Sequence, residues 1–149
     1  MIEIARSMDK AEVEKLDRHI PPSRLEECIR SGQVYVLKEA SEKSGDFSRC
    51  LAAGVLRYSL FWQTIPFLDL LYIEEEYRRR GFGTEMMRRW EADMKRIGYT
   101  SVMTSTQADE DAWRFYEKLG YRRIGGFFPA GQEAEEWIYE KRLEEEICI

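Results

Sequence analysis

The middle of the chain combines an apolar run, a basic glycine loop and an amphipathic segment, and this order limits the possible folds. The run IPFLDLLYI, residues 65–73, has the length and composition of a buried strand. Residues 84–97 carry apolar side chains at helical spacing, and a further strand is predicted at residues 100–106. Strand, helix and strand in this order predict a right-handed crossover between two parallel strands.

The loop between this strand and helix reads RRRGFGT, residues 78–84, and suits an anion. Gly81 and Gly83 let the backbone turn its N–H groups toward a ligand, and the helix adds unpaired donors and the positive end of its dipole. Such a loop binds phosphate or pyrophosphate, although a glycine turn with a solvated basic patch has the same pattern. The loop is not a Walker loop, because no Gly-Lys-Ser or Gly-Lys-Thr follows it. It does not match the dinucleotide-binding fingerprint G-x-G-x-x-G either, because Met86 occupies the position of the third glycine.

A second motif follows at residues 112–121, which read AWRFYEKLGY. Its apolar residues recur at i, i+3, i+4 and i+7, and Gly120 stands where a helix ends. Together, R-x-x-G-x-G at residues 78–83 and A-x-x-F-Y-x-x-L-G-Y resemble the GCN5-related N-acetyltransferase (GNAT) superfamily. The first is similar to its Q/R-x-x-G-x-G/A acetyl-CoA loop and the second to its A-x-x-F/L-Y-x-x-x-G-F/Y helix. The resemblance extends from about residue 65 to residue 121.

Alternating elements without a linker predict one three-layer α/β (α+β) domain over residues 1–149. The resemblance implies a mixed, twisted sheet with splayed central parallel strands and helices on both faces. Helices are expected at residues 9–17, 22–31, 84–97 and 112–119, and strands at 1–5, 33–40, 50–61, 65–73, 100–106, 121–127 and 135–143. Residues 41–49 read as a polar loop, and Ser23 with Glu26 form a capping-box pattern. A core stripe is expected from Met87, Trp90, Met94 and Ile97.

The resemblance implies acetyl-CoA as the cosubstrate, with its pantetheine arm along the backbone of residues 71–73. The expected cofactor contacts are Leu71, Tyr72, Ile73, Arg78, Arg79, Arg80, Gly81, Phe82, Gly83, Thr84 and Asp109. Asp109 stands where relatives commonly carry asparagine. It keeps acceptor oxygens but not the amide donor, and its main expected role is to cap the helix that follows.

In this chemistry an amine attacks a thioester, an oxyanion forms and a thiolate leaves. The resemblance makes Tyr116 the acid, because a phenol with a pKa near 10 matches an alkyl thiol; the alternative is a core tyrosine. The backbone N–H of Ile73, freed by a bulge, is the expected oxyanion donor.

The base is less defined. Asp69 is the only charged residue of FLDLLYI and is a candidate base, with a structural ion pair as the equal alternative, while Phe67 stands where relatives can carry glutamate. The only histidine, His19, is expected in a solvated loop.

Composition and charge indicate in which compartment the protein acts and which partners are disfavoured. A net charge of −5 disfavours nonspecific nucleic-acid binding, and no apolar stretch is long enough for a bilayer. The N-terminus lacks a signal-peptide profile. Cys28, Cys50 and Cys148 are odd in number and far apart, which predicts reduced thiols in a cytoplasm and no cysteine metal site.

We therefore expect an acetyl-CoA-dependent N-acetyltransferase that acts on a primary amine of a small molecule or peptide by direct attack in a ternary complex. The alternative is a non-catalytic acyl-CoA-binding regulatory module. Residues 19–21, 59–64 and 127–133 are expected around the acceptor, and an aromatic wall or core is expected from Tyr58, Phe61, Trp62 and Phe127. An open edge at strand 135–143 would allow a homodimer.

Overall fold

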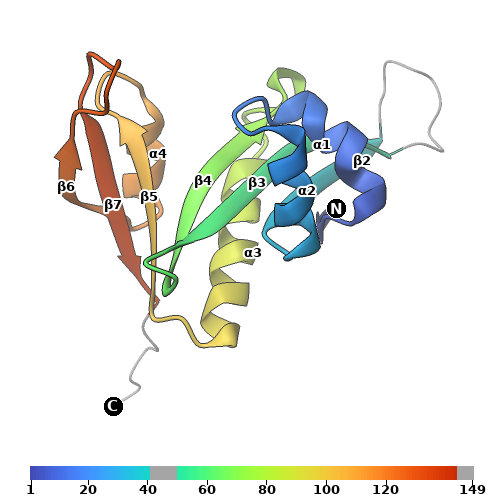
Figure 1. Ribbon diagram of the computed structural model, residues 1–149, viewed down its shortest axis with the longest axis horizontal. Helices are drawn as coiled ribbons and strands as arrows, with labels where there is room; N and C mark the ends of the chain where they lie inside the picture. Colours follow the sequence, from blue (N-terminus) through green and yellow to red (C-terminus); the bar gives the residue numbers. More distant parts are fainter. Residues whose placement is uncertain (41–49, 144–149) are drawn as a thin grey trace. The chain divides into compact units, whose positions relative to one another are not determined.

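The computed structural model describes residues 1–40 and 50–143, so the polar loop predicted at residues 41–49 lies outside the described residues, as do Cys148 and the side chain of Cys50 (Figure 1). The chain forms two compact units. Unit 1 comprises Met1–Tyr58 and Leu70–Arg89, and unit 2 comprises Ser59–Asp69 and Trp90–Ile149. The prediction that residues 1–149 act as a single domain stays a prediction.

The observed elements follow the predicted order. The strands are β1 (Ile2–Ile4), β2 (Val34–Ala40), β3 (Cys50–Phe61), β4 (Ile65–Ile73), β5 (Ser101–Gln107), β6 (Arg122–Phe127) and β7 (Glu136–Arg142). The helices are α1 (Lys10–Leu16), α2 (Pro22–Arg30), α3 (Phe82–Ile97) and α4 (Ala112–Lys118), with short 3-10 turns η1 (Ser7–Asp9) and η2 (Glu75–Tyr77).

The strands form a seven-stranded sheet in the order β1-β2-β3-β4-β5-β7-β6. β4 and β5 are parallel, with Phe67 opposite Met103 and Leu68 opposite Thr104, whereas β1–β2, β2–β3, β5–β7 and β6–β7 are antiparallel. This mixed sheet confirms the predicted α/β fold and the parallel connection from β4 through α3 to β5. The predicted splay and handedness of that connection stay predictions.

In unit 1, α1 and α2 cover one face of β2 and β3. The apolar side chains of this core lie at alternate strand positions and at helical spacing, as burial on one face requires. They are Val13 and Leu16 of α1, Leu25 and Ile29 of α2, Val34 and Val36 of β2, and Val55 of β3. Tyr35, between the two β2 valines, points the other way and packs under Arg89 of α3, 5.8 Å from its ring centre.

In unit 2, α4 packs on β5 and β7, and a charged cluster ties α3 to this layer. Glu91 of α3 is buried, and its two oxygens accept hydrogen bonds from the Tyr121 hydroxyl and from Lys141 Nζ, each at 2.7 Å. A buried carboxylate is tolerated because both partners compensate its lost hydration. The Glu91–Lys141 pair thus joins the last strand to α3.

Three local predictions are wrong. α2 begins at Pro22 with Pro21 as its N-cap and no side-chain cap, so Ser23 and Glu26 form no capping box; proline suits the first helical position because that position needs no N–H. Asp111, not Asp109, is the N-cap residue of α4. Ile97, predicted in the core, is 62% exposed at the end of α3.

A fourth prediction concerned the sheet edge. β7 lies between β5 and β6, so strand 135–143 offers no open edge. β6 and β1 are the edge strands instead. The closing hairpin was predicted correctly, but hairpin patterns do not say which of the two strands joins the rest of the sheet.

Candidate functional site

The basic glycine loop lies in unit 1 between η2 and α3. Arg79 has φ of 64° and Gly81 has φ of 82°, so two left-handed residues turn the chain into the helix. The first bond into this turn is donated by Glu85 N–H to Gly81 O at 3.0 Å. The amides of residues 82–84 precede that bond, and α3 continues for 16 residues, which gives these donors a full helix dipole. The loop has the geometry of an anion site, and α3 begins two residues earlier than predicted.

The three arginines of the loop differ in what they contact. Arg78 Nε donates to Ile73 O at 2.7 Å, and its guanidinium lies 5.3 Å from the centre of the Tyr72 ring. Arg80 stacks on Tyr77 at 5.6 Å. Arg79 has no hydrogen-bond or ion-pair partner within residues 1–40 and 50–143. Arg78 therefore faces the strand end, whereas Arg79 and Arg80 make no hydrogen bond or ion pair with their side chains within the described residues.

The strand end at residues 71–73 is half-buried and closely packed on β3. A Cβ on Gly54 of β3 would lie 2.7 Å from Ile73 Cδ1 and 3.2 Å from Tyr72 O. The neighbouring Ala53 O accepts from Glu74 N–H at 2.8 Å. Gly54 thus permits the close approach of the strand expected to hold pantetheine. Sequence reasoning missed Gly54, although a lone glycine inside a strand pattern signals close backbone approach.

A pocket of about 340 Å³ opens in unit 1 between α1 and β4. Its lining residues are Lys15, Leu16, Arg18, His19, Leu70, Tyr72 and Glu74. His19 therefore lies beside β4, and the expected place of its loop at the acceptor stays a prediction. Tyr72 was predicted as a cofactor contact and not as part of such a pocket, and Glu74, directly after the strand, was missed, although both alternate with Leu70 in the sequence.

Tyr116 lies in unit 2 on α4, buried beneath the sheet with 7% of its surface exposed. Burial raises the pKa of its phenol to about 12, although a hydrogen bond with Thr104 by itself would lower that pKa. The Thr104 hydroxyl also donates to Leu68 O at 3.2 Å. Tyr116 is thereby linked through Thr104 to the residue that precedes Asp69.

Asp69 is exposed, whereas its strand neighbours Pro66 and Leu68 are buried. The premise that this carboxylate is hidden in an apolar strand is therefore wrong, because strand alternation turns it outward. Asp69 does have an interaction partner, and its role as a base stays a prediction. Asp109 is also exposed, two residues before the α4 N-cap, and its expected cofactor contact stays a prediction too.

The predicted aromatic wall divides into core and surface. Tyr58 is buried, but Trp62 is 78% exposed at the tip of the β3–β4 hairpin. Trp62 and Gln63 both have left-handed backbones, with φ of 54° and 61°. The Phe61 ring lies 4.7 Å from Trp62 and 6.3 Å from Phe67, so the hairpin presents an exposed aromatic cluster.

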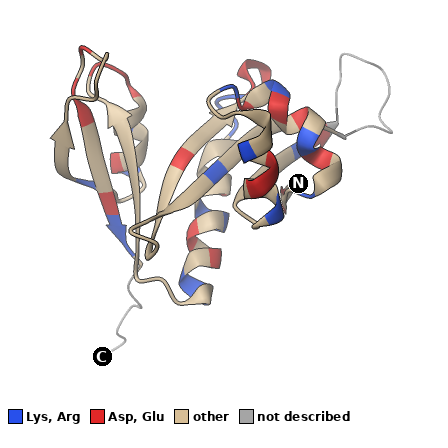
Figure 2. Ribbon diagram, in the orientation of Figure 1, with Lys and Arg blue, Asp and Glu red and all other residues tan. Residues whose placement is uncertain are grey.

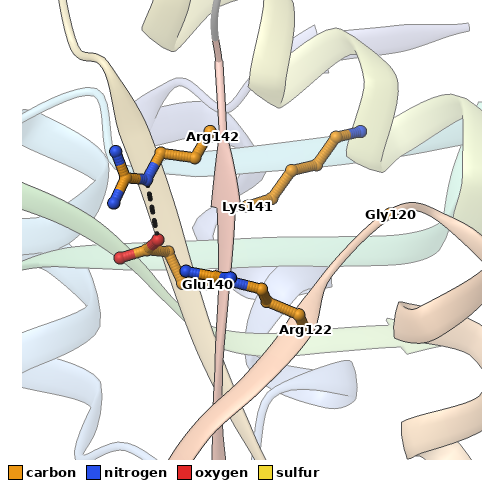
Figure 3. A pocket seen from close by; sticks show the side chains of 5 residues that line it. All are labelled: Gly120, Arg122, Glu140, Lys141 and Arg142. Carbon is orange, nitrogen blue, oxygen red and sulfur yellow. Dashed lines mark hydrogen bonds and ion pairs between the residues drawn. The ribbon is translucent and has the colours of Figure 1, made fainter.

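A second pocket, of about 440 Å³, opens in unit 2 where β6 and β7 begin and end (Figure 3). It is lined by Gly120, Arg122, Glu140, Lys141 and Arg142, and Arg142 Nε lies 3.0 Å from Glu140 Oε1. In the close-up Lys141 extends to the other side of β7 from this ion pair, toward its partner Glu91. No residue predicted to act in the site lines this pocket.

In the part of the chain that the structure describes, no three His, Cys, Asp or Glu side chains are grouped as metal ligands. Every helix within residues 1–40 and 50–143 is too short or too polar to cross a lipid bilayer.

Residues 4–121 match the family model described as acetyltransferase (GNAT) family. No curated protein sequence matches the chain significantly. Among solved structures, the NatC complex bound to Gag peptide and CoA is 16% identical with a TM-score of 0.79, over 97% of this chain and 98% of that chain. Ard1 from Thermoplasma volcanium is 17% identical with a TM-score of 0.78, over 97% and 98%. Arabidopsis thaliana NAA60 in complex with acetyl-CoA is 13% identical with a TM-score of 0.78, over 95% and 97%.

Proposed function

Because the chain belongs to the acetyltransferase (GNAT) family and acetyl-CoA is its cosubstrate, we propose that it transfers the acetyl group to a primary amine by direct attack in a ternary complex. The observation that carries this proposal is the basic loop. Its two left-handed residues, Arg79 and Gly81, lead into the free amides of a 16-residue helix, a donor set suited to pyrophosphate.

Cofactor binding is proposed to use three groups of donors. The amides of residues 82–84 and the guanidinium groups of Arg79 and Arg80 would hold the pyrophosphate. The backbone of residues 71–73 would pair with the pantetheine arm, next to Gly54. The Ile73 carbonyl accepts from Arg78, and the N–H of the same residue is the group proposed for the oxyanion.

Tyr116 is the proposed acid. With a pKa of about 12 its phenol is protonated at neutral pH and keeps a proton for the leaving thiolate, but burial makes it a weaker acid than the alkyl thiol that it was expected to match. The hydrogen bond with Thr104 holds the phenol oxygen beside β5. The alternative is a purely structural tyrosine in the core of unit 2.

Two carboxylates compete for the role of base. Asp69 is exposed on β4 and within reach of water, and Glu74 lines the pocket of unit 1. We keep Asp69 as the proposed base. Asp69→Asn should change the acidic limb of the pH–rate profile, whereas Glu74→Gln should leave it in place. The reverse result would assign the base to Glu74.

The acceptor is proposed to be the primary amine of a small molecule or a peptide, bound at the pocket beside His19. NatC was solved with a peptide, which makes peptide N-termini one class to test. Release of CoA thiol with a panel of amines, read together with mass spectrometry of the amine, tests the proposal. CoA binding without acetylation of any amine would favour the alternative, a regulatory acyl-CoA-binding module.

We also propose an assembly, a homodimer, and a location, the cytoplasm, each from a single observation. A homodimer formed by strand pairing would use an edge strand, and β6 is the edge strand nearest the C-terminus in sequence. Light scattering over a wide concentration range would test this, and a constant monomer mass would contradict it. A cytoplasmic location is proposed from the odd number and wide spacing of the cysteines.

A further inference from the structure

The pocket of unit 1 is richer in basic than in acidic groups, although the whole chain has a net charge of −5. Lys15, Arg18 and His19 line its helical side, and Glu74 lines its strand side. Acidic and basic residues are otherwise interspersed along α1, α2 and α3 (Figure 2). The excess of cations at this pocket is therefore a local grouping.

These charges are available to a ligand. The side chains of Arg18, His19 and Glu74 make no hydrogen bond or ion pair within residues 1–40 and 50–143. Lys15 Nζ lies 2.8 Å from Glu12 Oε1, but this pair is solvent-exposed and holds the lysine only weakly. The pocket thus has opposite charges on opposite walls and no internal pairing between them.

The basic wall is also fixed in place. Asp17, whose side chain is fully buried, accepts from Arg57 Nε at 2.7 Å through Oδ2. Its other oxygen, Oδ1, accepts from the backbone N–H of His19 at 3.2 Å. The segment that carries Arg18 and His19 is therefore anchored by a buried carboxylate. Pre-ordered charges cost a ligand less entropy than charges that must be collected on binding.

We propose that this pocket selects acceptor amines that also carry a carboxylate, with the ammonium group toward Glu74 and the carboxylate toward Arg18 and Lys15. The proposal rests on the proposed function, because it concerns the acceptor of the same reaction. A simple cation would meet the basic wall without a counter-charge, whereas a zwitterionic group complements both walls. The α-carboxylate of a free amino acid and the side chain of an acidic N-terminal residue share this chemistry.

Calorimetric binding of two matched acceptor pairs, with CoA present, tests the selection and separates its two sources. One pair is L-leucine and L-leucinamide; the other is a tetrapeptide beginning with glutamate and the same peptide beginning with glutamine. In at least one pair the acidic member should bind about fivefold tighter or more, the upper range of an exposed ion pair. The advantage should shrink as salt is raised.

Arg18→Glu should remove or reverse this advantage. Arg24→Glu is the matched control, since it makes the same charge change on an exposed position of α2 outside the pocket. The preference should survive in that control. Both variants should keep the wild-type melting temperature, because both arginines are exposed and make no ion pair among the described residues.

Equal binding of both members in both pairs, no binding of any member, or an Arg18→Glu protein that behaves like Arg24→Glu would overturn the inference. Acetyl transfer to the same compounds is measured in parallel. Charge-selective binding without any transfer would contradict the proposed function and leave the selection intact. Transfer without charge selection would contradict only the selection.

Discussion

Removing the Tyr116 hydroxyl separates its proposed chemical role from its structural one. Tyr116→Phe keeps the ring and its edge-on contacts with Phe115 and Tyr121, at 5.3 and 5.8 Å. What is lost is the hydrogen bond to Thr104, whose hydroxyl keeps its bond to Leu68 O. The expected loss of stability is therefore that of one buried hydrogen bond with a partner left otherwise satisfied, about 1 kcal/mol.

The kinetic effect should be much larger. If Tyr116 protonates the leaving thiolate, kcat should fall about 10²–10⁴-fold while the KM for acetyl-CoA changes little, because the interaction is made in the transition state. Steady-state thiol release at saturating acceptor measures both constants. A variant with near-normal kcat would refute the acid role and leave Tyr116 as a core residue.

The pKa of Tyr116 gives an independent check on its burial. The phenol ionises near pH 10 in the unfolded chain and at about 12 in the fold, so the unfolded state loses its proton first as pH rises. The resulting stability is fully present below pH 10 and is lost between pH 10 and 12, to an extent of about 2–3 kcal/mol. Urea unfolding at several pH values should therefore show a shallower alkaline decline for Tyr116→Phe than for the wild type. Identical declines would mean that the hydroxyl is not desolvated.

Three further substitutions test the rest of the account. Gly54→Ala should raise the KM for acetyl-CoA about tenfold with a stability loss below about 2 kcal/mol, because the new Cβ would press on Tyr72 O. The control Gly125→Ala, whose Cβ would have no atom within 4 Å, should keep the wild-type KM, and equal KM values in the two variants would contradict the role of Gly54. Asp17→Asn should lower the free energy of unfolding by about 2–4 kcal/mol in urea titrations, because it breaks a buried ion pair. The control Glu14→Gln, at a half-buried position whose ion pair with Lys10 reaches the surface, should lose about a few tenths of a kcal/mol, and similar losses in both variants would show that Asp17 is not an anchor. Arg78→Lys should weaken acceptor binding at least as much as CoA binding, because Arg78 donates to Ile73 O and stacks on the Tyr72 ring. Calorimetry measures both affinities, and a loss of affinity for CoA alone would make Arg78 a phosphate ligand.

The sequence predicted most of the fold because its signals were local and strong. The left-handed glycines Gly32, Gly81 and Gly120 all stand where helix ends or turns were expected. The errors occurred where packing overrides pattern. The Ser23 pattern forms no cap because Pro21 and Pro22 already suit the start of α2. Ile97 continues the apolar stripe of α3, but the helix ends there beyond the buried core.

The site was predicted less completely for a physical reason. Motif spacing indicated the basic loop and Tyr116 as candidates, but Glu74 and Arg18 lie 56 residues apart in the sequence and line one pocket only because of the fold. The exposure of Asp69 depends on which strand face is covered, and alternation alone cannot say which. The need for glycine at position 54 comes from its close contact with Tyr72 on the next strand, which the sequence alone does not show.

The most direct test of the central claim is mass spectrometry of an amine and peptide panel incubated with acetyl-CoA and the purified protein. We predict a mass gain of one acetyl group on at least one primary amine, matched by equimolar CoA release and lost in Tyr116→Phe. CoA release without amine acetylation, or acetylation that continues unchanged in Tyr116→Phe, would contradict the account.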